Sequence, residues 1–274
     1  MSVINTNVNA LFSQNAMKVN NRTLTNAMEQ LSTGQRINSA KDDAAGLAIT
    51  NTMTSNIRGL AQAVRNANDG VSMLQTAEGA MIEQTNMLQR MRELAVQAST
   101  SSYNSTQIGY LDTEFQALDT QINNIAAQTT WNGVSLLNVS GGGTQSFVVG
   151  SAGTEVIAVT IANTTNTASG LATTSLAVSS AGSAAAAITA IDLALVTINT
   201  ARAKIGAGIN QLTYAADNLN NVVQNTTASR SQILDTDYAV ATTKLASAQI
   251  IAQAATAMLA QANQSQQGVL ALLK

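Results

Sequence analysis

The strongest hydrophobic pattern of the sequence lies in residues 234–274. Apolar residues recur there at alternating spacings of three and four, which is the heptad pattern of a helix that packs along one stripe. The stripe consists of Leu234, Tyr238, Ala241, Leu245, Ala248, Ala252, Ala255, Leu259, Ala262, Gln266, Val269 and Leu273. We predict one helix of about 60 Å over this range, at 1.5 Å of rise per residue, with a stripe that needs a partner to cover it.

Residues 1–34 repeat this pattern more weakly. Two short stripes with helical spacing consist of Ile4, Val8 and Leu11 and of Leu24, Met28 and Leu31. Gly34 then predicts the end of the helix, because glycine readily adopts the left-handed conformation that closes helices. No sequence remains to cover both ends within one chain, so we predict that they contact other copies of it. The predicted subunit-assembly residues are Ile4, Val8, Leu11, Leu245, Ile251, Leu259, Val269 and Leu273.

Two further helices are predicted before the middle of the chain. Ser39 and Asp42 form a capping-box-like pattern, in which Ser39 caps the helix while Asp42 and Asp43 favour its positive end. Apolar residues then recur with helical spacing over 57–88 and again over 111–125.

The following segment changes from helical spacing to turn and β signals. The sequences WNG at 131–133 and GGG at 141–143 predict turns. Two β-branched runs, at 147–149 and 156–161, predict a β-hairpin. Residues 163–183 are rich in Ser, Thr, Ala and Gly and are predicted to form a surface loop.

Helical spacing returns over 188–223, so the order is long helices, a small β insert and long helices. The sequence therefore predicts a mainly α fold, a long antiparallel helical bundle or coiled coil formed by the N- and C-terminal halves, with a small β-hairpin insert. We predict an inner terminal domain made of two helical halves, 1–43 and 234–274. Between them, 44–233 is predicted to be a rod-like middle domain with the hairpin at about 140–183.

The composition of the chain excludes several kinds of catalytic, metal-binding and nucleic-acid-binding site. The chain has no Cys and no His, which excludes a thiolate or imidazole catalyst and the usual zinc ligand sets. With 13 Lys and Arg against 15 Asp and Glu, and 3% aromatic residues, it offers neither a basic face nor stacking platforms for nucleic acid. We expect no enzymatic activity, no metal and no cofactor.

The acidic pairs and the glycine run have ordinary structural interpretations. The pair Asp42 and Asp43, and the pair Asp235 and Asp237, are expected to cap helices and form salt bridges, because no His or Cys completes a catalytic or metal site. The run at 141–143 lacks the lysine and the strand–helix context of a phosphate-binding loop.

Neither a membrane-spanning segment nor a cleaved signal is expected. No stretch of about 18 consecutive apolar residues is present. Residues 1–7 lack the charged and apolar regions of a secretory signal peptide.

An ordered set of short motifs occupies both ends of the sequence. The N-terminal motifs are INTN at 4–7, LSTGQRINSAKDDAAG at 31–46, NDG at 68–70, QRMRELA at 89–95 and WNG at 131–133. The C-terminal motifs are SRS at 229–231, DTDYA at 235–239 and AQANQ at 260–264. No single motif is diagnostic, but the ordered set resembles bacterial flagellin.

The resemblance implies a structural subunit of the bacterial flagellar filament, outside the cell, with both ends coiled together along the inner tube of a helical homopolymer. It implies export through the flagellum's own apparatus, without signal cleavage and with an export chaperone, and contacts with the filament cap and hook-junction proteins. Only about 50 residues separate the matching ends, so the chain resembles a short flagellin that lacks the variable outer domains.

Four residues resemble the patch that the vertebrate Toll-like receptor for flagellin reads: Gln89, Arg90, Leu94 and Glu114. The alternative interpretation is a lateral packing surface between subunits, and the two roles are compatible. Arg90 and Leu94 are four residues apart and are predicted to share one helical face.

Two other functions compete with this interpretation. A hook–filament junction protein of the same superfamily shares the terminal stripes, but the motifs at 89–95 and 131–133 favour flagellin. A flagellin with an inserted metalloprotease requires the zinc-binding histidines of a His-Glu-x-x-His helix, and the chain has no His.

Overall fold

The computed structural model describes residues 6–138, 143–167 and 170–271, and side chains as far as residue 265. The chain divides into two compact units. The terminal unit contains Met1–Ser55 and Asn225–Lys274, and the central unit contains Asn56–Gln224.

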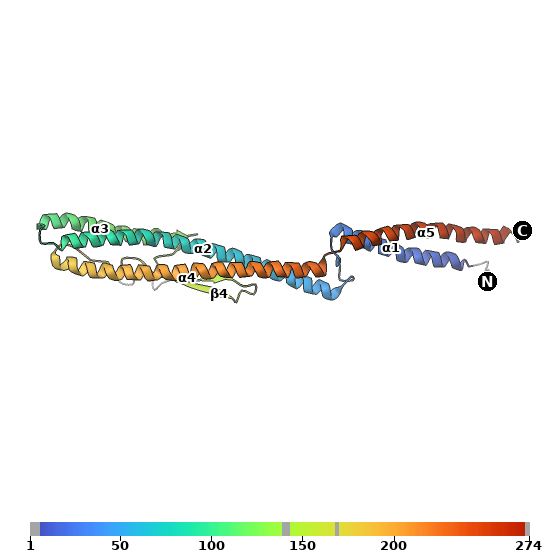
Figure 1. Ribbon diagram of the computed structural model, residues 1–274, viewed down its shortest axis with the longest axis horizontal. Coiled ribbons are helices and arrows are strands. Elements are labelled where there is room, and N and C mark those ends of the chain that lie inside the picture. The colour runs from blue at the N-terminus through green and yellow to red at the C-terminus, as the bar shows by residue number, and fades with distance from the viewer. Residues whose placement is uncertain (1–5, 139–142, 168–169, 272–274) are drawn as a thin grey trace. The chain divides into compact units, whose positions relative to one another are not determined.

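Two antiparallel helices, α1 (Val8–Thr33) and α5 (Tyr238–Ala271), make up most of the terminal unit (Figure 1). The side-chain carboxamide of Asn7 accepts a hydrogen bond from the Ala10 N–H at 2.9 Å and caps the start of α1. Gly34 ends α1 in the left-handed conformation, with φ of 71°, as predicted.

Small residues fill the seam between α1 and α5. On α5, Ala241 and Ala248 are buried and the other predicted stripe positions from Leu245 to Ala262 are half-buried, which confirms that part of the stripe, whereas Tyr238 at the start of α5 is 59% exposed. On α1, the residues that face α5 are Ala10, Ser13, Met17, Asn20, Leu24, Ala27 and Leu31. The prediction for α1 was therefore right for Leu24 and Leu31, whereas Val8, Leu11 and Met28 are exposed.

Three side chains fix how the two helices are aligned, because each donates a hydrogen bond to a backbone carbonyl of the other helix. Asn7 Nδ2 donates to the Ala262 carbonyl at 3.0 Å, and Asn20 Nδ2 donates to the Ala248 carbonyl at 2.8 Å. At the other end of the coil, the Tyr238 hydroxyl donates to the Leu31 carbonyl at 2.9 Å.

A short connection ties the end of α1 to the segment before α5. Gln35 and Asp235 form an antiparallel bridge, and the Arg36 N–H donates to the Leu234 carbonyl at 2.7 Å. The Arg36 guanidinium also donates twice to the Ile233 carbonyl, at 3.2 and 2.7 Å.

The capping prediction for the next helix was wrong in detail. The Asp43 carboxylate accepts a hydrogen bond from the Gly46 N–H at 2.8 Å, so Asp43 caps α2 (Ala44–Ala98). Ser39 instead donates its N–H and hydroxyl to the Asp42 carboxylate, both at 3.0 Å. The helix starts later than predicted because residues 39–43 form a turn closed on Asp42.

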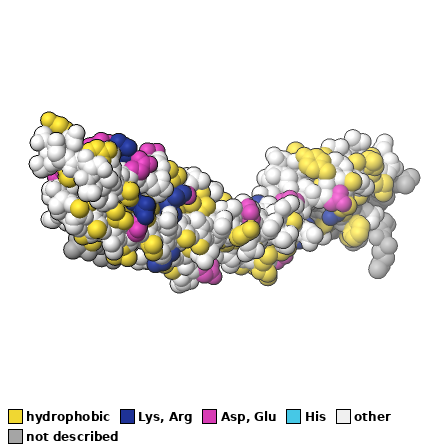
Figure 2. Space-filling view, turned by 60° about the vertical axis from the view of Figure 1, so that its left-hand side comes forward, with side chains coloured by type: hydrophobic (Ala, Val, Ile, Leu, Met, Phe, Trp, Pro, Cys, Tyr) yellow, Lys and Arg dark blue, Asp and Glu magenta, His cyan; other side chains and the backbone are white. Residues whose placement is uncertain are grey.

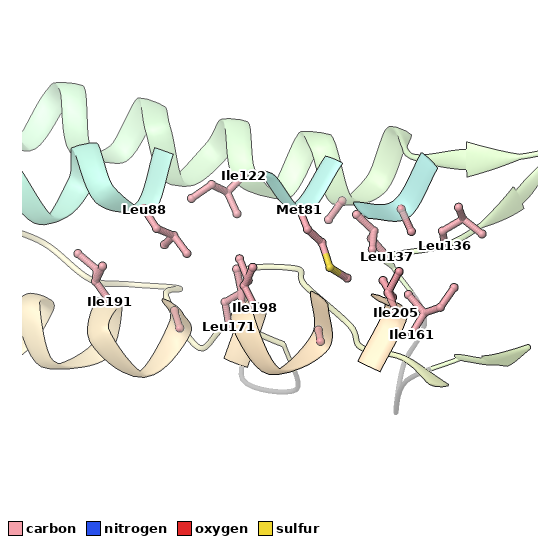
Figure 3. Packing of buried hydrophobic residues seen from close by; sticks show 14 of the residues in the cluster. Met81, Leu88, Ile122, Leu136, Leu137, Ile161, Leu171, Ile191, Ile198 and Ile205 are labelled. Carbon is pink, nitrogen blue, oxygen red and sulfur yellow. The ribbon is translucent and has the colours of Figure 1, made fainter. Parts of the chain in front are cut away.

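Three helices pack together in the central unit: parts of α2 and α4 (Ala181–Leu234), and the whole of α3 (Ser105–Gln128) (Figure 1). Arg90 of α2 forms an ion pair with Glu114 of α3. Arg92 of α2 forms one with Asp192 of α4, so this part of α2 contacts both helices. Figure 3 shows the core, in which Met81 and Leu88 point toward side chains of α3, α4 and the β insert.

The β insert contains two short antiparallel pairs. β1 (Thr130–Trp131) and β2 (Val134–Ser135) are joined by Asn132 and Gly133, both with positive φ, the tight hairpin turn expected of an Asn-Gly pair. β3 (Gly143–Val148) pairs with β4 (Val156–Ile161) in the predicted hairpin.

Two helical glycines let this second hairpin approach the bundle. A Cβ atom at Gly70 would lie 2.7 Å from the Phe147 ring, and one at Gly208 would lie 2.6 Å from a Val159 methyl group. This close approach gives the NDG motif at 68–70 a packing role.

The predicted surface loop at 163–183 is wrong, because much of this segment is buried against α3. Thr164, Leu171, Thr173 and Val178 are all buried. The segment packs inward because a polar stripe on α3 accepts and donates its hydrogen bonds.

That stripe consists of Asp112, Gln116 and Asp119. Asp112 accepts from the Val178 N–H at 2.7 Å, and Gln116 donates to the Leu176 carbonyl at 2.6 Å. The buried Asp119 carboxylate accepts from the Thr173 hydroxyl at 2.7 Å and from the Asn166 amide at 2.8 Å.

The expectation about membrane-spanning segments also needs correction. α4 contains an 18-residue window with a mean hydropathy of 1.8, which is long and apolar enough to cross a membrane by length and composition. Residues of α4 such as Ala187, Ile191 and Ile198 lie in the core of the central unit. Their apolar character therefore has a packing explanation within the fold.

Candidate assembly surfaces

The predicted assembly residues fall into two structural groups. Leu245 and Leu259 are half-buried in the seam, where they hold α5 against α1. Val8, Leu11 and Ile251 are more than half exposed and face away from the seam. Ile4 and Leu273 lie outside the described residues, as does the side chain of Val269.

Several exposed apolar side chains of the terminal unit escaped the sequence prediction. Phe12 is 77% exposed, and Val19, Val240, Ile250 and Met258 are also exposed. Figure 2 shows such hydrophobic side chains on the surface of this unit, with few charged groups among them. Large apolar side chains are rarely left in contiguous exposed patches unless they contact another molecule.

A groove of about 590 Å³ runs along one side of the α1–α5 coil. Phe12 and Val19 line it from α1, and Ala248 and Ile251 line it from α5, with Lys244 at its edge. A search for helical periodicity in one segment could not find this groove, because its walls come from opposite ends of the chain.

The predicted receptor or lateral patch is only partly a surface. Gln89, Arg90 and Glu114 are exposed, but Leu94 is 1% exposed and belongs to the core of the central unit. The side chain of Leu94 therefore cannot contact a partner in this structure. Residues four apart differ by about 40° around a helix, and the edge of the buried stripe falls between Arg90 and Leu94.

Arg90 is held in place by two carboxylates. Its Nε and Nη2 atoms donate to Glu114 Oε1 at 3.0 and 2.9 Å, and its Nη1 atom donates to Glu93 Oε2 at 3.0 Å. The hydrogen bonds that Arg90 donates to Glu114 and, to a smaller extent, to Glu93 raise the pKa of the Arg90 guanidinium. The patch thus presents a fixed positive group between two acids.

A second exposed ion pair joins α2 to α4 beside this patch. Arg92 Nε donates to Asp192 Oδ1 at 2.7 Å, and this hydrogen bond raises the pKa of Arg92. Sequence spacing gave no signal for the pair, because 100 residues separate its members.

The acidic pairs cap helices and close turns, as predicted, but none of the ion pairs among the described residues includes them. Desolvation raises the pKa of the Asp42 carboxyl, but hydrogen bonds from Ser39 and Asn38 lower it by more, so the pKa lies below its ordinary value. Asp235 accepts from the Ser231 hydroxyl at 2.6 Å, and Asp237 accepts from the Ala239 N–H at 2.9 Å at the start of α5.

Among the residues that the structure describes, no group of three or more acidic residues is arranged to hold a metal ion. The features that stand out among the described residues are the coil, its groove and the exposed ion pairs.

Comparison with protein families identifies both ends of the chain. Residues 4–141 match the bacterial flagellin N-terminal helical region, and residues 188–273 match the bacterial flagellin C-terminal helical region. Together the two matches cover most of the chain.

Relatives extend the match over the full length. A flagellin of Halalkalibacterium halodurans is 40% identical over 272 residues, which cover 99% of this chain and 100% of the relative. A flagellar filament core protein of Brachyspira hyodysenteriae is 39% identical over 284 residues, with 99% and 100% covered.

Solved structures agree at the level of the fold. The crystal structure of Bacillus cereus flagellin is similar to 57% of this chain, over 88% of its own length, with a TM-score of 0.51 and 31% identity. A putative flagellar hook-associated protein from Vibrio parahaemolyticus has a TM-score of 0.59 over 71% of this chain and 100% of its own, but at 13% identity it shows a shared fold alone.

The hook-junction alternative thus has no better support than flagellin, whereas the terminal motifs, the helical coil and the full-length relatives agree with one another. From these agreements it follows that the chain belongs to the bacterial flagellin family and is a structural subunit of the extracellular flagellar filament.

Proposed function

We propose that the α1–α5 coil is the polymerisation element of this subunit and that the central unit forms the rod-like domain around the inner tube. The observation that carries the proposal is the terminal unit itself, whose two helices meet along a thin seam and leave large apolar side chains exposed. Such surface becomes buried only when another molecule covers it.

The domain boundaries follow the same reasoning. In this proposal, 1–43 and 234–274 form the inner terminal domain, and 44–233 forms the middle domain. Contacts within the chain support a similar division, with the boundaries of the terminal unit placed at Ser55 and Asn225.

Further partners beyond the polymer itself are proposed, and membership of the flagellin family supports them. The subunit is proposed to pass through the flagellar export apparatus without signal cleavage, guarded by an export chaperone. In the filament it contacts copies of itself, with the cap and hook-junction proteins at the two ends. We propose no enzymatic activity, because the described surfaces offer contact features rather than paired catalytic groups.

Partial proteolysis tests the role of the coil. Ordering a residue costs about 1–2 kcal/mol, and the Ala-rich seam buries little apolar area in return. In the free subunit we therefore expect brief protease treatment to remove roughly 40–60 residues from each end and to leave the central helices intact.

The filament supplies the comparison. Assembled subunits are expected to keep both ends under the same protease treatment, as read by mass spectrometry of the digested protein. Ends that resist cleavage equally in the monomer and in the filament would contradict the proposal.

The exposed patch of Gln89, Arg90 and Glu114 is proposed to contact the vertebrate Toll-like receptor for flagellin in the monomer and a lateral neighbour in the filament. Leu94 is left out because it is buried. A guanidinium already oriented by two carboxylates loses little further freedom on binding.

Arg90→Ala is expected to weaken receptor binding by about 2 kcal/mol, which is typical of an interface hot spot. The measurement is a binding titration beside a receptor reporter assay, with monomer, filament and variant compared. Arg65→Ala is a matched control, because Arg65 lies on the exposed surface of the same helix and bonds to Gln62. Equal binding by Arg90→Ala and the wild type would leave the lateral contact as the role of the patch.

A further inference from the structure

The two sides of the α1–α5 coil differ in chemistry. The residue that precedes a seam residue in the sequence lies on the groove side of the coil, and the residue that follows it lies on the opposite side. Around Ser13 these are Phe12 and Gln14, and around Ala252 they are Ile251 and Gln253.

Other turns follow the same rule. Val19 and Asn21 lie on either side of Asn20, which donates across the seam to Ala248. Met258 shares the side of Ile251, because the two are seven residues apart on one helix. The groove side thus carries large apolar side chains on both helices, interspersed with polar residues such as Thr23, Lys244 and Ser247, whereas the opposite side of α5 carries mainly Gln, Thr and Ala among the described residues.

On the opposite side, the exposed large apolar side chains of the described residues belong to α1. They are Val8, Leu11 and Met28. Val8 follows Asn7, which faces α5 through its bond to Ala262, and Leu11 follows the buried Ala10. Val8 and Leu11 are one turn apart and form a short ridge, whereas Met28 stands alone near the other end of the helix.

A filament is an open polymer, so each copy must offer two different surfaces that fit each other. An apolar groove on one side and an apolar ridge on the other meet this requirement within a single coil. The volume of the groove, about 590 Å³, lies within the range of protein clefts that bury a bound group.

We propose that the ridge formed by Val8 and Leu11 of one copy seats in the groove lined by Phe12, Val19, Ala248 and Ile251 of the next copy. This inference rests on the proposed role of the coil in polymerisation and adds which surfaces meet. It makes the contact head to tail, rather than groove to groove or ridge to ridge.

Cysteine cross-linking tests the contact directly, because the natural chain contains no Cys. Filaments are grown from an equal mixture of two full-length variants, Leu11→Cys and Ile251→Cys, and are treated with a mild oxidant that converts two thiols to a disulfide. A disulfide forms only where the two Cα atoms lie within about 7 Å. We expect a cross-linked pair of chains whose joined peptides contain positions 11 and 251.

Three control experiments, two with mixed filaments and one with filaments of a single variant, test whether the cross-link is specific. Leu11→Cys mixed with Gln253→Cys is expected to give no cross-link, because Gln253 lies on the polar side of α5. Filaments of Ile251→Cys alone that cross-link would show groove-to-groove packing and overturn the proposal. Met28→Cys cross-linking to Ile251→Cys in place of Leu11→Cys would overturn the choice of ridge.

A second measurement covers the case in which a cysteine variant does not assemble. Ile251→Glu is expected to raise the protein concentration needed for polymerisation by about tenfold or more, since it puts a charge into an apolar groove. Gln253→Glu adds the same charge on the other side and is expected to change that concentration less than about twofold.

The outcomes separate the two proposals. Equal effects of Ile251→Glu and Gln253→Glu, in a wild-type protein that polymerises, would overturn the groove and leave the role of the coil standing. Wild-type protein that forms no filaments would overturn that role itself.

Discussion

Replacing Leu259 by Asp is expected to abolish filament formation while leaving the central unit folded. Leu259 lies half-buried in the seam between α5 and α1. A carboxylate there faces the apolar side of α1 without an opposite charge, and burying it without a partner costs several kcal/mol. The thin Ala-rich seam has little stability to offset that loss.

The measurement is electron microscopy together with sedimentation of the polymer, with circular dichroism as the check on folding. Gln253→Asp is the matched control, because it adds the same charge to the exposed side of the same helix and is expected to polymerise. Normal filaments from Leu259→Asp would contradict the role of the seam. A loss of the main thermal transition would mean that the substitution acts on the central unit instead.

Asp119→Ala is expected to destabilise the central unit by about 2–4 kcal/mol. The carboxylate accepts hydrogen bonds from Thr173 and Asn166, and removing it leaves the buried Thr173 hydroxyl and the Asn166 amide without this acceptor. Each unsatisfied buried polar group costs about 1–3 kcal/mol. The segment that crosses α3 is then expected to lose its anchor.

Urea unfolding of the central transition measures this effect. Asp217→Ala removes an exposed carboxylate from α4 and is expected to change the free energy of unfolding by less than about 0.5 kcal/mol. Equal midpoints for Asp119→Ala and the wild type would show that the segment is held by apolar packing alone, through residues such as Leu171 and Val178.

Periodicity predicted the elements whose buried faces are built from apolar residues. The seam of α5 repeats Ala and Leu at heptad spacing over many turns. The two β-branched runs flank a turn and pair with each other as antiparallel strands. These patterns survive in the fold because one physical requirement, burial of one face, decides each of them.

The buried positions of α1 are harder to predict from the sequence than those of α5. Those of α1 include Ala10, Asn20 and Ala27, which no hydrophobicity pattern distinguishes from surface residues. The larger Val8 and Leu11 produce the visible stripe and are exposed. The pattern on α1 thus identified Val8 and Leu11, which are proposed to meet another copy, and of the residues that face α5 it identified Leu24 and Leu31 but missed the small and polar ones.

Segments held by polar contacts could not be predicted either. The loop after β4 consists largely of Thr, Asn, Ala and Ser, a composition typical of surface loops, yet Asp119 and Gln116 bind it to α3. Its burial depends on partners about 50 residues away, which local composition does not reveal. The burial of Leu94 likewise depends on where α3 and α4 pack, and not on its distance from Arg90 along the helix.

Copies of this chain are proposed to polymerise through the α1–α5 coil. A helical reconstruction of filaments grown from the purified chain tests it most directly. We expect α1 and α5 to be paired at the inner wall of the tube, with Asn20 bonded to Ala248 as in this structure, and the central helices to lie at larger radius. Filaments held together by the central unit alone, with α1 and α5 absent from the inner wall, would contradict it.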